Sequence, residues 1–249
     1  GRGAIDETYD NYIGMIGSYG NRCANMGVAN ADLLIALGTR LDTRQTGARL
    51  DQFLSNGHII HVDIDDNELE YHRLLNRKKV NCTIDCFLQK EKEMPISLGD
   101  ISEWNFFLHG LKQRYGQDAE IERFVENKSP YRFMQYFDSL TQTDDVICAD
   151  IGQNQMWAAQ TLRLKSGQKF VTSGGLAPMG FSLPVAIGCS FANPNKKVFS
   201  INGDGGFHMA IQSLMLISQY NLPIKVIILN NASLGMITQF QHLYFDDRM

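Results

Sequence analysis

The sequence has few cysteines, and their spacing argues against a metal site. There are five, they are scattered, and their number is odd. Cys82 and Cys86 lie four residues apart, which does not fit the usual zinc spacings, and no second pair completes a site. We therefore expect reduced thiols and a cytoplasmic location.

Long apolar runs and basic runs are also missing. No apolar run reaches the roughly 18–20 residues of a membrane-spanning helix. The net charge is -4 and basic residues do not cluster, which argues against nucleic acids and membranes as partners. There is no internal repeat and no low-complexity tract. The 249 residues, 44% hydrophobic and 20% charged, are typical of a soluble globular protein with more than one structural unit.

Short apolar runs alternate with stretches of helical length. This alternation predicts an α/β fold with two Rossmann-like units, each a doubly wound parallel sheet. The strands are expected at residues 33–37, 59–62, 146–149, 170–171, 198–201 and 224–229. The helices are expected at residues 22–30, 50–56, 132–140, 156–162, 183–192 and 208–220.

The composition also changes along the chain. We expect a first unit over residues 1–87 and a second over residues 129–249. Residues 88–128, rich in Lys and Glu, are expected to form an exposed connecting segment with short helices.

Two polar motifs directly follow two of the expected strands. The sequence NGDGGF (residues 202–207) follows the strand at 198–201, and NNAS (residues 230–233) follows the strand at 224–229. With the helix between them they form a βαβ unit, in which parallel strands lie side by side. Asp204 and Asn231 are then expected to emerge together at the carboxyl ends of the strands, where open α/β sheets bind ligands.

This pair suits a hard divalent cation. Mg²⁺ takes about six oxygens and usually binds through one or two carboxylates and substrate phosphates. Asp204 and Asn231 supply oxygens, and the carbonyl of Ser233 is a third candidate ligand. Three glycines, Gly203, Gly205 and Gly206, leave room for a diphosphate at a helix N-terminus. The alternative is that Asp204 caps the helix and Asn231 forms a turn.

The two motifs together resemble the thiamine diphosphate (ThDP) signature. Residues 1–8, 31–47, 152–160, 172–188 and 235–241 further resemble the catalytic large subunits of acetolactate synthases. The resemblance implies a ThDP- and Mg²⁺-dependent transferase, a carboligase of branched-chain amino acid biosynthesis. Such an enzyme decarboxylates pyruvate and joins the two-carbon unit to a second 2-oxo acid. A 2-oxo acid decarboxylase or oxidase on the same scaffold, and a non-catalytic cofactor-binding module, stay open as alternatives.

The resemblance also implies which residues contact ThDP. Met179 would be the apolar wedge that bends the cofactor, and the carbonyl of Ala177, where the family more often has glycine, would accept from its amine. Asn154 stands where the family more often has histidine. The stretch Ile151–Asn154 would contact the diphosphate. The implied ThDP residues are Gly152, Gln153, Asn154, Ala177, Met179, Gly203, Asp204, Gly205, Gly206, Asn231, Ser233, Leu234, Gly235 and Met236.

Substrate and flavin contacts follow from the same resemblance. Met236 and Phe240 would face the substrate, although acetolactate synthases typically carry Trp at the second position; ordinary helix packing is the alternative. FAD is a further implied cofactor, with a surface Arg–Asp cluster as the alternative. Its implied contacts are Tyr19, Gly20, Gly38, Thr39, Arg40, Asp42, Arg44, Asp63 and Ile64.

Compared with the family, we expect the chain to begin within the central domain and to end inside the diphosphate domain. The family's catalytic glutamate lies in the N-terminal domain, so no catalytic residue is assigned here and the segment alone is expected to be inactive. Family sites form between subunits, which implies a homodimer or higher oligomer. A regulatory subunit is a further implied partner.

Overall fold

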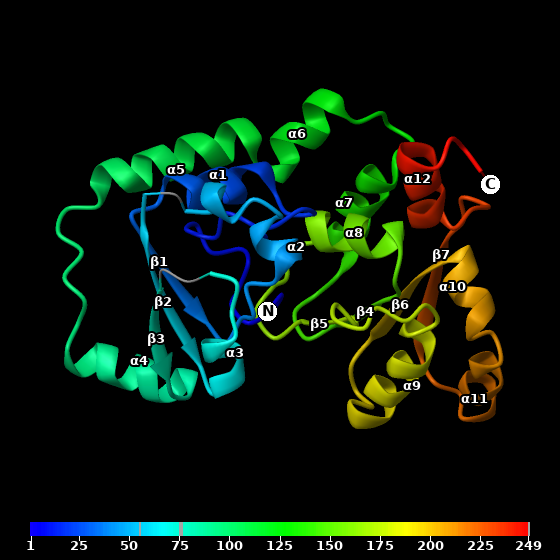
Figure 1. Cartoon of the computed structure of the whole chain (residues 1–249). Helices are drawn as coiled ribbons and strands as arrows, with labels where there is room; N and C mark the ends of the chain where they lie inside the picture. Colours follow the sequence, from blue (N-terminus) through cyan, green and yellow to red (C-terminus); the bar gives the residue numbers. More distant parts are fainter. Residues whose placement is uncertain (55, 75–76, 249) are drawn as a thin grey trace. The chain divides into compact units, whose positions relative to one another are not determined.

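The computed structural model describes residues 1–54, 56–74 and 77–248, which form two compact units (Figure 1). The first unit holds residues 1 and 10–123, and the second holds residues 2–9 and 124–249. Each contains one parallel sheet, which confirms the α/β class. The domain limits expected from the sequence remain a prediction. Within the described residues, no helix has the length and apolar character needed to cross a membrane.

The first unit is built on a three-stranded sheet in the order β1-β2-β3. The strands are β1 (Leu33–Leu37), β2 (His58–Asp63) and β3 (Arg77–Asn81). The sequence did not predict β3, because Val80 is its only aliphatic residue. Charged side chains are tolerated here because β3 is an edge strand, which leaves much of its surface to solvent.

Helices complete the first unit. They are α1 (Arg22–Asn30), α2 (Thr43–Thr46), α3 (Asp66–Glu70), α4 (Ile84–Glu93), α5 (Ser102–Tyr115) and α6 (Gln117–Phe124). The longest, α5, packs against α1 and buries Leu111. The helix expected at residues 50–56 is wrong: the described part of that segment, which excludes residue 55, has a single 3-10 turn (Leu50–Gln52). Leu54 has a positive φ, which a helix cannot accommodate.

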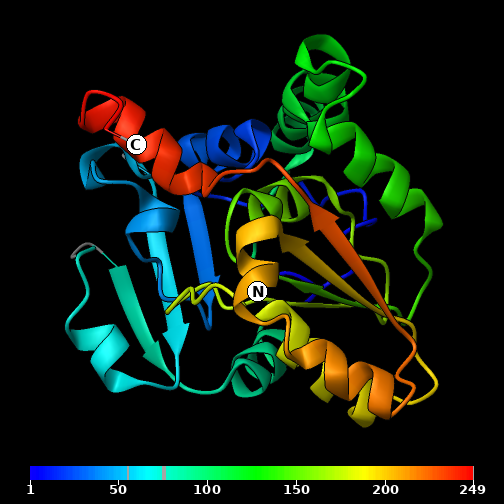
Figure 2. The ribbon, with the colours of Figure 1, turned by 90° about the vertical axis from the view of Figure 1, so that its right-hand side faces the viewer.

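The second unit has a four-stranded parallel sheet in the order β5-β4-β6-β7. Its strands are β4 (Val146–Ala149), β5 (Lys169–Val171), β6 (Val198–Gly203) and β7 (Ile224–Leu229). From β4 the chain continues to β5 on one side of β4 and then to β6 on the other. The direction of winding therefore reverses at β4. Figure 2 shows β7 (orange) beside β6 at the edge of this sheet.

Helices cover both faces of this sheet. On one face α7 (Pro130–Leu140) and α8 (Gln153–Thr161) pack on Ile147 and Ile201. On the other, α9 (Ser182–Ala192) packs on Val146, Cys148 and Val198. Successive strand residues point to opposite faces, so a strand covered on both sides must be apolar throughout. All four residues of β4 are buried.

The crossover between β6 and β7 differs from the expectation. The single helix predicted at residues 208–220 is wrong: the chain forms α10 (Asp204–Met209) and α11 (Ser213–Gln219). Between them the carbonyls of residues 210, 211 and 212 accept hydrogen bonds from the amides three residues later. These tight turns redirect the chain, and no Gly or Pro in residues 210–212 marks them in the sequence. The last helix is α12 (Gly235–Tyr244).

The segment of residues 2–9 is fastened to the second unit by a buried ion pair. The guanidinium of Arg2 contacts both carboxylate oxygens of Glu7, with Nε 2.7 Å from Oε1. Arg2 also donates to the carbonyl of Leu162, and the amide and carbonyl of Leu164 both bond to Glu7. Because these groups are shielded from water, removing one charge leaves the other uncompensated.

We expect Glu7→Gln to lower the free energy of unfolding of the second unit by about 3 kcal/mol, because it leaves the buried Arg2 charge without a counter-charge. Urea unfolding followed by Trp157 fluorescence in a Trp104→Phe background measures this value. The control is Lys196→Gln, which breaks an exposed ion pair with Asp144 in the same unit and should cost at most about 1 kcal/mol. Equal losses of unfolding free energy in the two variants would contradict the conclusion that the Arg2–Glu7 pair stabilises the second unit as a buried ion pair.

Candidate functional site

A pocket opens at the carboxyl ends of β4, β6 and β7 in the second unit. It encloses about 530 Å³, part of it open to solvent. This is where reversed winding leaves a crevice between the loops that follow β4 and β6. The pocket is lined by Ile151, Gly152, Gln153, Asn154, Trp157, Met179, Gly203, Asp204, Gly205, Gly206, Leu229, Asn231, Ser233, Leu234, Gly235, Met236 and Ile237.

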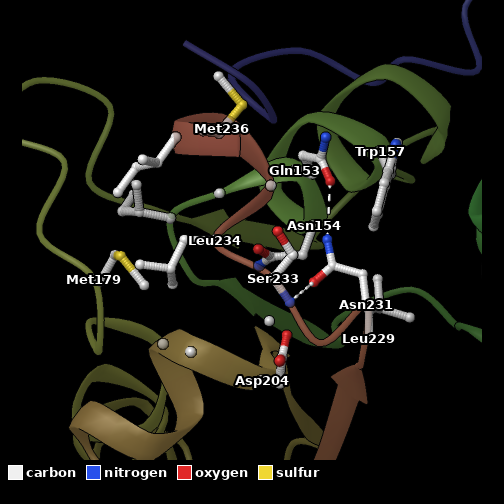
Figure 3. Close-up of a pocket in the computed structure, with 17 residues that line it drawn as sticks. Gln153, Asn154, Trp157, Met179, Asp204, Leu229, Asn231, Ser233, Leu234 and Met236 are labelled. Carbon is white, nitrogen blue, oxygen red and sulfur yellow. Dashed lines mark hydrogen bonds between the residues drawn. The ribbon is translucent and has the colours of Figure 1, made fainter. Parts of the chain in front are cut away.

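The structure brings the two polar motifs together. Asp204 is the first residue of α10, and Asn231 and Ser233 follow β7, which pairs in parallel with β6. Figure 3 shows the Asp204 carboxylate facing the loop that carries Asn231 and Ser233. The βαβ argument from the sequence therefore located these residues correctly.

The capping alternative for Asp204 does not hold. The residue at the cap position of α10 is Gly203, which has no side chain, and Asp204 lies one position further on, in the first turn of the helix. Within the described residues, the Asp204 carboxylate has no hydrogen bond or ion pair. The turn alternative, in contrast, holds for the other motif, because Asn231 Oδ1 accepts the amide of Ser233 at 3.1 Å. Asn231 thus shapes the loop and lines the pocket at the same time.

Gln153 connects two loops across the pocket. Its Oε1 accepts a hydrogen bond from Asn231 Nδ2 at 3.1 Å (Figure 3). This contact uses the nitrogen of the Asn231 amide and so fixes which way its oxygen points. A Cβ atom on Gly235 would overlap Gln153 Oε1, so the contact requires glycine at that position.

Asn154, which stands where the family more often has histidine, bonds to the backbone of the sheet. It is buried, and its Nδ2 donates to the carbonyls of Asp150 at 2.9 Å and Ile201 at 3.4 Å. The side chain therefore links the carboxyl ends of β4 and β6. Because both partners are carbonyls, its donors serve the backbone and its oxygen is left for the pocket.

Apolar contacts form another wall of the pocket. A Cβ atom on Gly205 would collide with Leu234 Cδ2, and it would lie 3.2 Å from Met179 Cε. These two side chains therefore lie over Gly205, and a side chain at that position would have to displace them. Ala177, two residues before Met179, has φ +56°, which costs a residue with a Cβ about 1 kcal/mol.

Two predicted residues lie away from the lining of this pocket, and three unpredicted residues belong to it. Ala177 is absent from the lining, and Phe240 is 57% exposed and packs against Tyr244 and Phe245. Trp157, Leu229 and Ile237 line the pocket but were not predicted. Helical spacing could have found Trp157, which lies one turn after Gln153 on α8.

In the first unit, the residues implied for FAD come from neighbouring loops. Gly38, Thr39 and Arg40 follow β1, and Asp63 ends the adjacent strand β2, with Ile64 next in the chain. The loop with Tyr19 and Gly20 joins them, because the amide of Ser18 donates to the carbonyl of Arg44 at 2.7 Å.

Several of these side chains already have partners. Asp42 caps α2 by accepting the amides of Arg44 and Gln45. Arg40 pairs with Glu68 at 3.1 Å, and both side chains are partly exposed. Two histidines form hydrogen bonds with the backbone of the loop after β1: His61 bonds to the Thr39 carbonyl at 2.8 Å and His72 to the Arg40 carbonyl at 2.7 Å. Burial lowers the pKa of His61, which favours its neutral form.

No cluster of three His, Cys, Asp or Glu side chains that could hold a metal occurs within the described residues. The oxygen donors that the pocket offers a cation are the carboxylate of Asp204, side-chain amide oxygens and backbone carbonyls. This donor set suits Mg²⁺ rather than zinc. The residues present thus fit a Mg²⁺-diphosphate group.

Comparisons with known proteins agree with this fit. Residues 1–86 match the model for the central domain of thiamine pyrophosphate enzymes, and residues 150–249 match the model for their C-terminal TPP-binding domain. TPP is another name for ThDP.

Three relatives show the extent of the similarity. The acetolactate synthase large subunit of Porphyra purpurea is 36% identical over 100% of this chain and 42% of its own length. Acetolactate synthase 2, chloroplastic, of Brassica napus is 39% identical over 94% of this chain and 37% of its own length. The isozyme 2 large subunit of Escherichia coli is 34% identical over 100% of this chain and 44% of its own length.

The chain thus spans less than half the length of these relatives. The two family models together cover most of it, and every residue that lines the pocket lies within the TPP-binding match. The chain therefore belongs to the thiamine pyrophosphate enzymes.

Proposed function

We propose that the protein carrying this chain is a ThDP- and Mg²⁺-dependent carboligase of the acetolactate synthase kind. It decarboxylates pyruvate and joins the two-carbon unit to a second 2-oxo acid. The observation that supports this most is the pocket in which Asp204, which has no partner in the part of the chain that the structure describes, faces Asn231 and Ser233. The similarity to acetolactate synthases along the chain supports the reaction class.

The residues of the pocket have distinct tasks in this proposal. ThDP, when bound, supplies the carbanion chemistry, and the protein binds and orients it. Asp204, the oxygen of Asn231 and the carbonyl of Ser233 hold Mg²⁺. The first turn of α8, with Gly152 and Gln153, faces the diphosphate, because free amides at a helix N-terminus favour anions.

Apolar side chains orient and shield the rest of the cofactor. Met179 and Leu234 meet above Gly205 and exclude water from that side of the pocket. Met236, on α12, is the proposed substrate contact. Phe240 lies one turn further on the same helix and is our second candidate for that contact.

For the first unit we propose FAD, held by the loops that contain Gly20, Gly38 and Arg44. Support comes from the hydrogen bond between Ser18 and Arg44, which brings these loops together. Relatives are named large subunits, and on that ground we propose an oligomer that includes a second, regulatory subunit.

We expect Asp204→Asn in the full-length protein to weaken Mg²⁺-dependent ThDP binding about 100-fold, because the cation loses its charged ligand. Isothermal calorimetry with and without Mg²⁺ measures the effect. Asp144→Asn, which removes a carboxylate before β4 instead of after β6, serves as the control and should bind as the wild type does. Unchanged binding by Asp204→Asn would refute the metal assignment.

The reaction itself is tested with the full-length protein, ThDP, Mg²⁺, FAD and ¹³C-labelled pyruvate, with products identified by NMR. We expect acetolactate, because a carboligase forms a carbon–carbon bond. Acetaldehyde or acetate would assign the protein to the decarboxylases or oxidases instead. Absence of any turnover, together with intact ThDP binding, would favour a non-catalytic role or a different substrate.

A further inference from the structure

Asp150 is a buried carboxylate beside the pocket that the proposed function does not use. It directly follows β4, and its exposed fraction is 0%. Within the described residues it forms no ion pair with a cationic side chain. A buried carboxylate without such a partner is costly unless hydrogen bonds compensate it.

Backbone amides provide that compensation. Oδ2 accepts the amide of Gly180 at 3.1 Å, and Oδ1 accepts the amide of Phe181 at 2.9 Å. These two residues lie just before α9, an 11-residue helix whose N-terminus favours a negative charge. Hydrogen bonds from amides to an ionised acceptor are stronger than those between neutral groups.

These amides belong to the residues directly after Met179. The carboxylate therefore fixes the chain at the point where Met179 enters the pocket. Asp150 is itself fixed, because its amide donates to the carbonyl of Ile201 on β6 at 2.8 Å. The position of the Met179 loop is thus defined relative to the sheet.

The same carboxylate also lies against the metal-binding turn. A Cβ atom on Gly206 would overlap Asp150 Oδ2. Gly206 is two residues after Asp204, in the first turn of α10. One buried side chain therefore contacts both the loop that carries Met179 and the turn that begins with Asp204.

We propose that Asp150 is a positioning residue of the ThDP site. Its carboxylate sets the distance between the Met179 wedge and the Asp204–Gly206 turn before any cofactor binds. This inference rests on the proposed function of the pocket as a ThDP site.

A first test needs no variant. In the full-length protein without ThDP, hydrogen exchange is measured for the amides of Gly180 and Phe181, with the exposed Gly175 as reference. We expect the two amides to exchange at least about 100-fold more slowly than Gly175, because they are hydrogen-bonded to a buried acceptor. Similar rates for all three would overturn the proposal.

A matched pair of variants separates positioning from stability. Asp150→Asn keeps the shape but can accept only one of the two amides in the same way. Asp145→Asn is the control: Asp145 lies at the opposite end of β4, is 5% exposed and accepts the amide of Gln142 at 2.8 Å. We expect the ThDP dissociation constant to rise about 10- to 100-fold in Asp150→Asn, by analogy with groups that orient metal ligands, and to stay within about twofold in Asp145→Asn.

Coupling to Met179 provides a readout that a purely structural role would not change. If Asp150 acts through Met179, the loss of ThDP affinity in Met179→Ala should not grow further when Asp150→Asn is added. Additive losses would overturn the proposal. If Asp150→Asn does not fold, Asp150→Ser, which keeps one acceptor, replaces it in the cycle.

The outcomes also distinguish the inference from the function on which it rests. A wild-type protein that binds no ThDP would refute the proposed function, and the inference with it. A wild type that binds ThDP while Asp150→Asn behaves like Asp145→Asn would refute the inference alone.

Discussion

The reversal of winding at β4 is the constraint on which the site of the second unit depends. Because β5 and β6 lie on opposite sides of β4, the helices that follow β4 and β5 cover opposite faces of the sheet. The loops after β4 and β6 then diverge and leave a crevice. Two side chains of the pocket tie its loops to this frame: Asn154 links β4 to β6, and Gln153 links the loop after β4 to the loop after β7.

These attachments leave the residues of the pocket prepared for a ligand. The amide of Asn231 is oriented by Gln153 and by Ser233, and Asn154 is tied to the backbone, while the carboxylate of Asp204 has no partner within the described residues. A site whose side chains are already fixed loses little conformational entropy on binding. Glycine at positions 205, 206 and 235 is the complementary requirement, because a Cβ atom there would enter the space of Leu234, Asp150 or Gln153.

The sequence was sufficient for the parts of the structure that have strong local signals. Buried strands such as β4 are apolar throughout, and Asp204 and Asn231 follow such strands, so their meeting could be predicted from topology alone. It was not sufficient where tertiary contacts decide. The charged strand β3 is stabilised by pairing with β2, and the turn between α10 and α11 carries no Gly or Pro to mark it. No local signal pointed to Asp150, because the partners of its carboxylate lie 30 and 31 positions away.

The two ends of the four-stranded sheet differ in whether they could accept an insertion or an attached probe. All the contacts of the pocket lie at the carboxyl ends of the strands, whereas the turns before β4 and β6 are joined at the surface by the ion pair of Lys196 with Asp144. Asn195, in the turn before β6, is exposed. An affinity tag, a fluorophore or an inserted segment at that turn would leave the pocket untouched, so the amino-terminal edge of the sheet is the natural attachment point for probes of this protein.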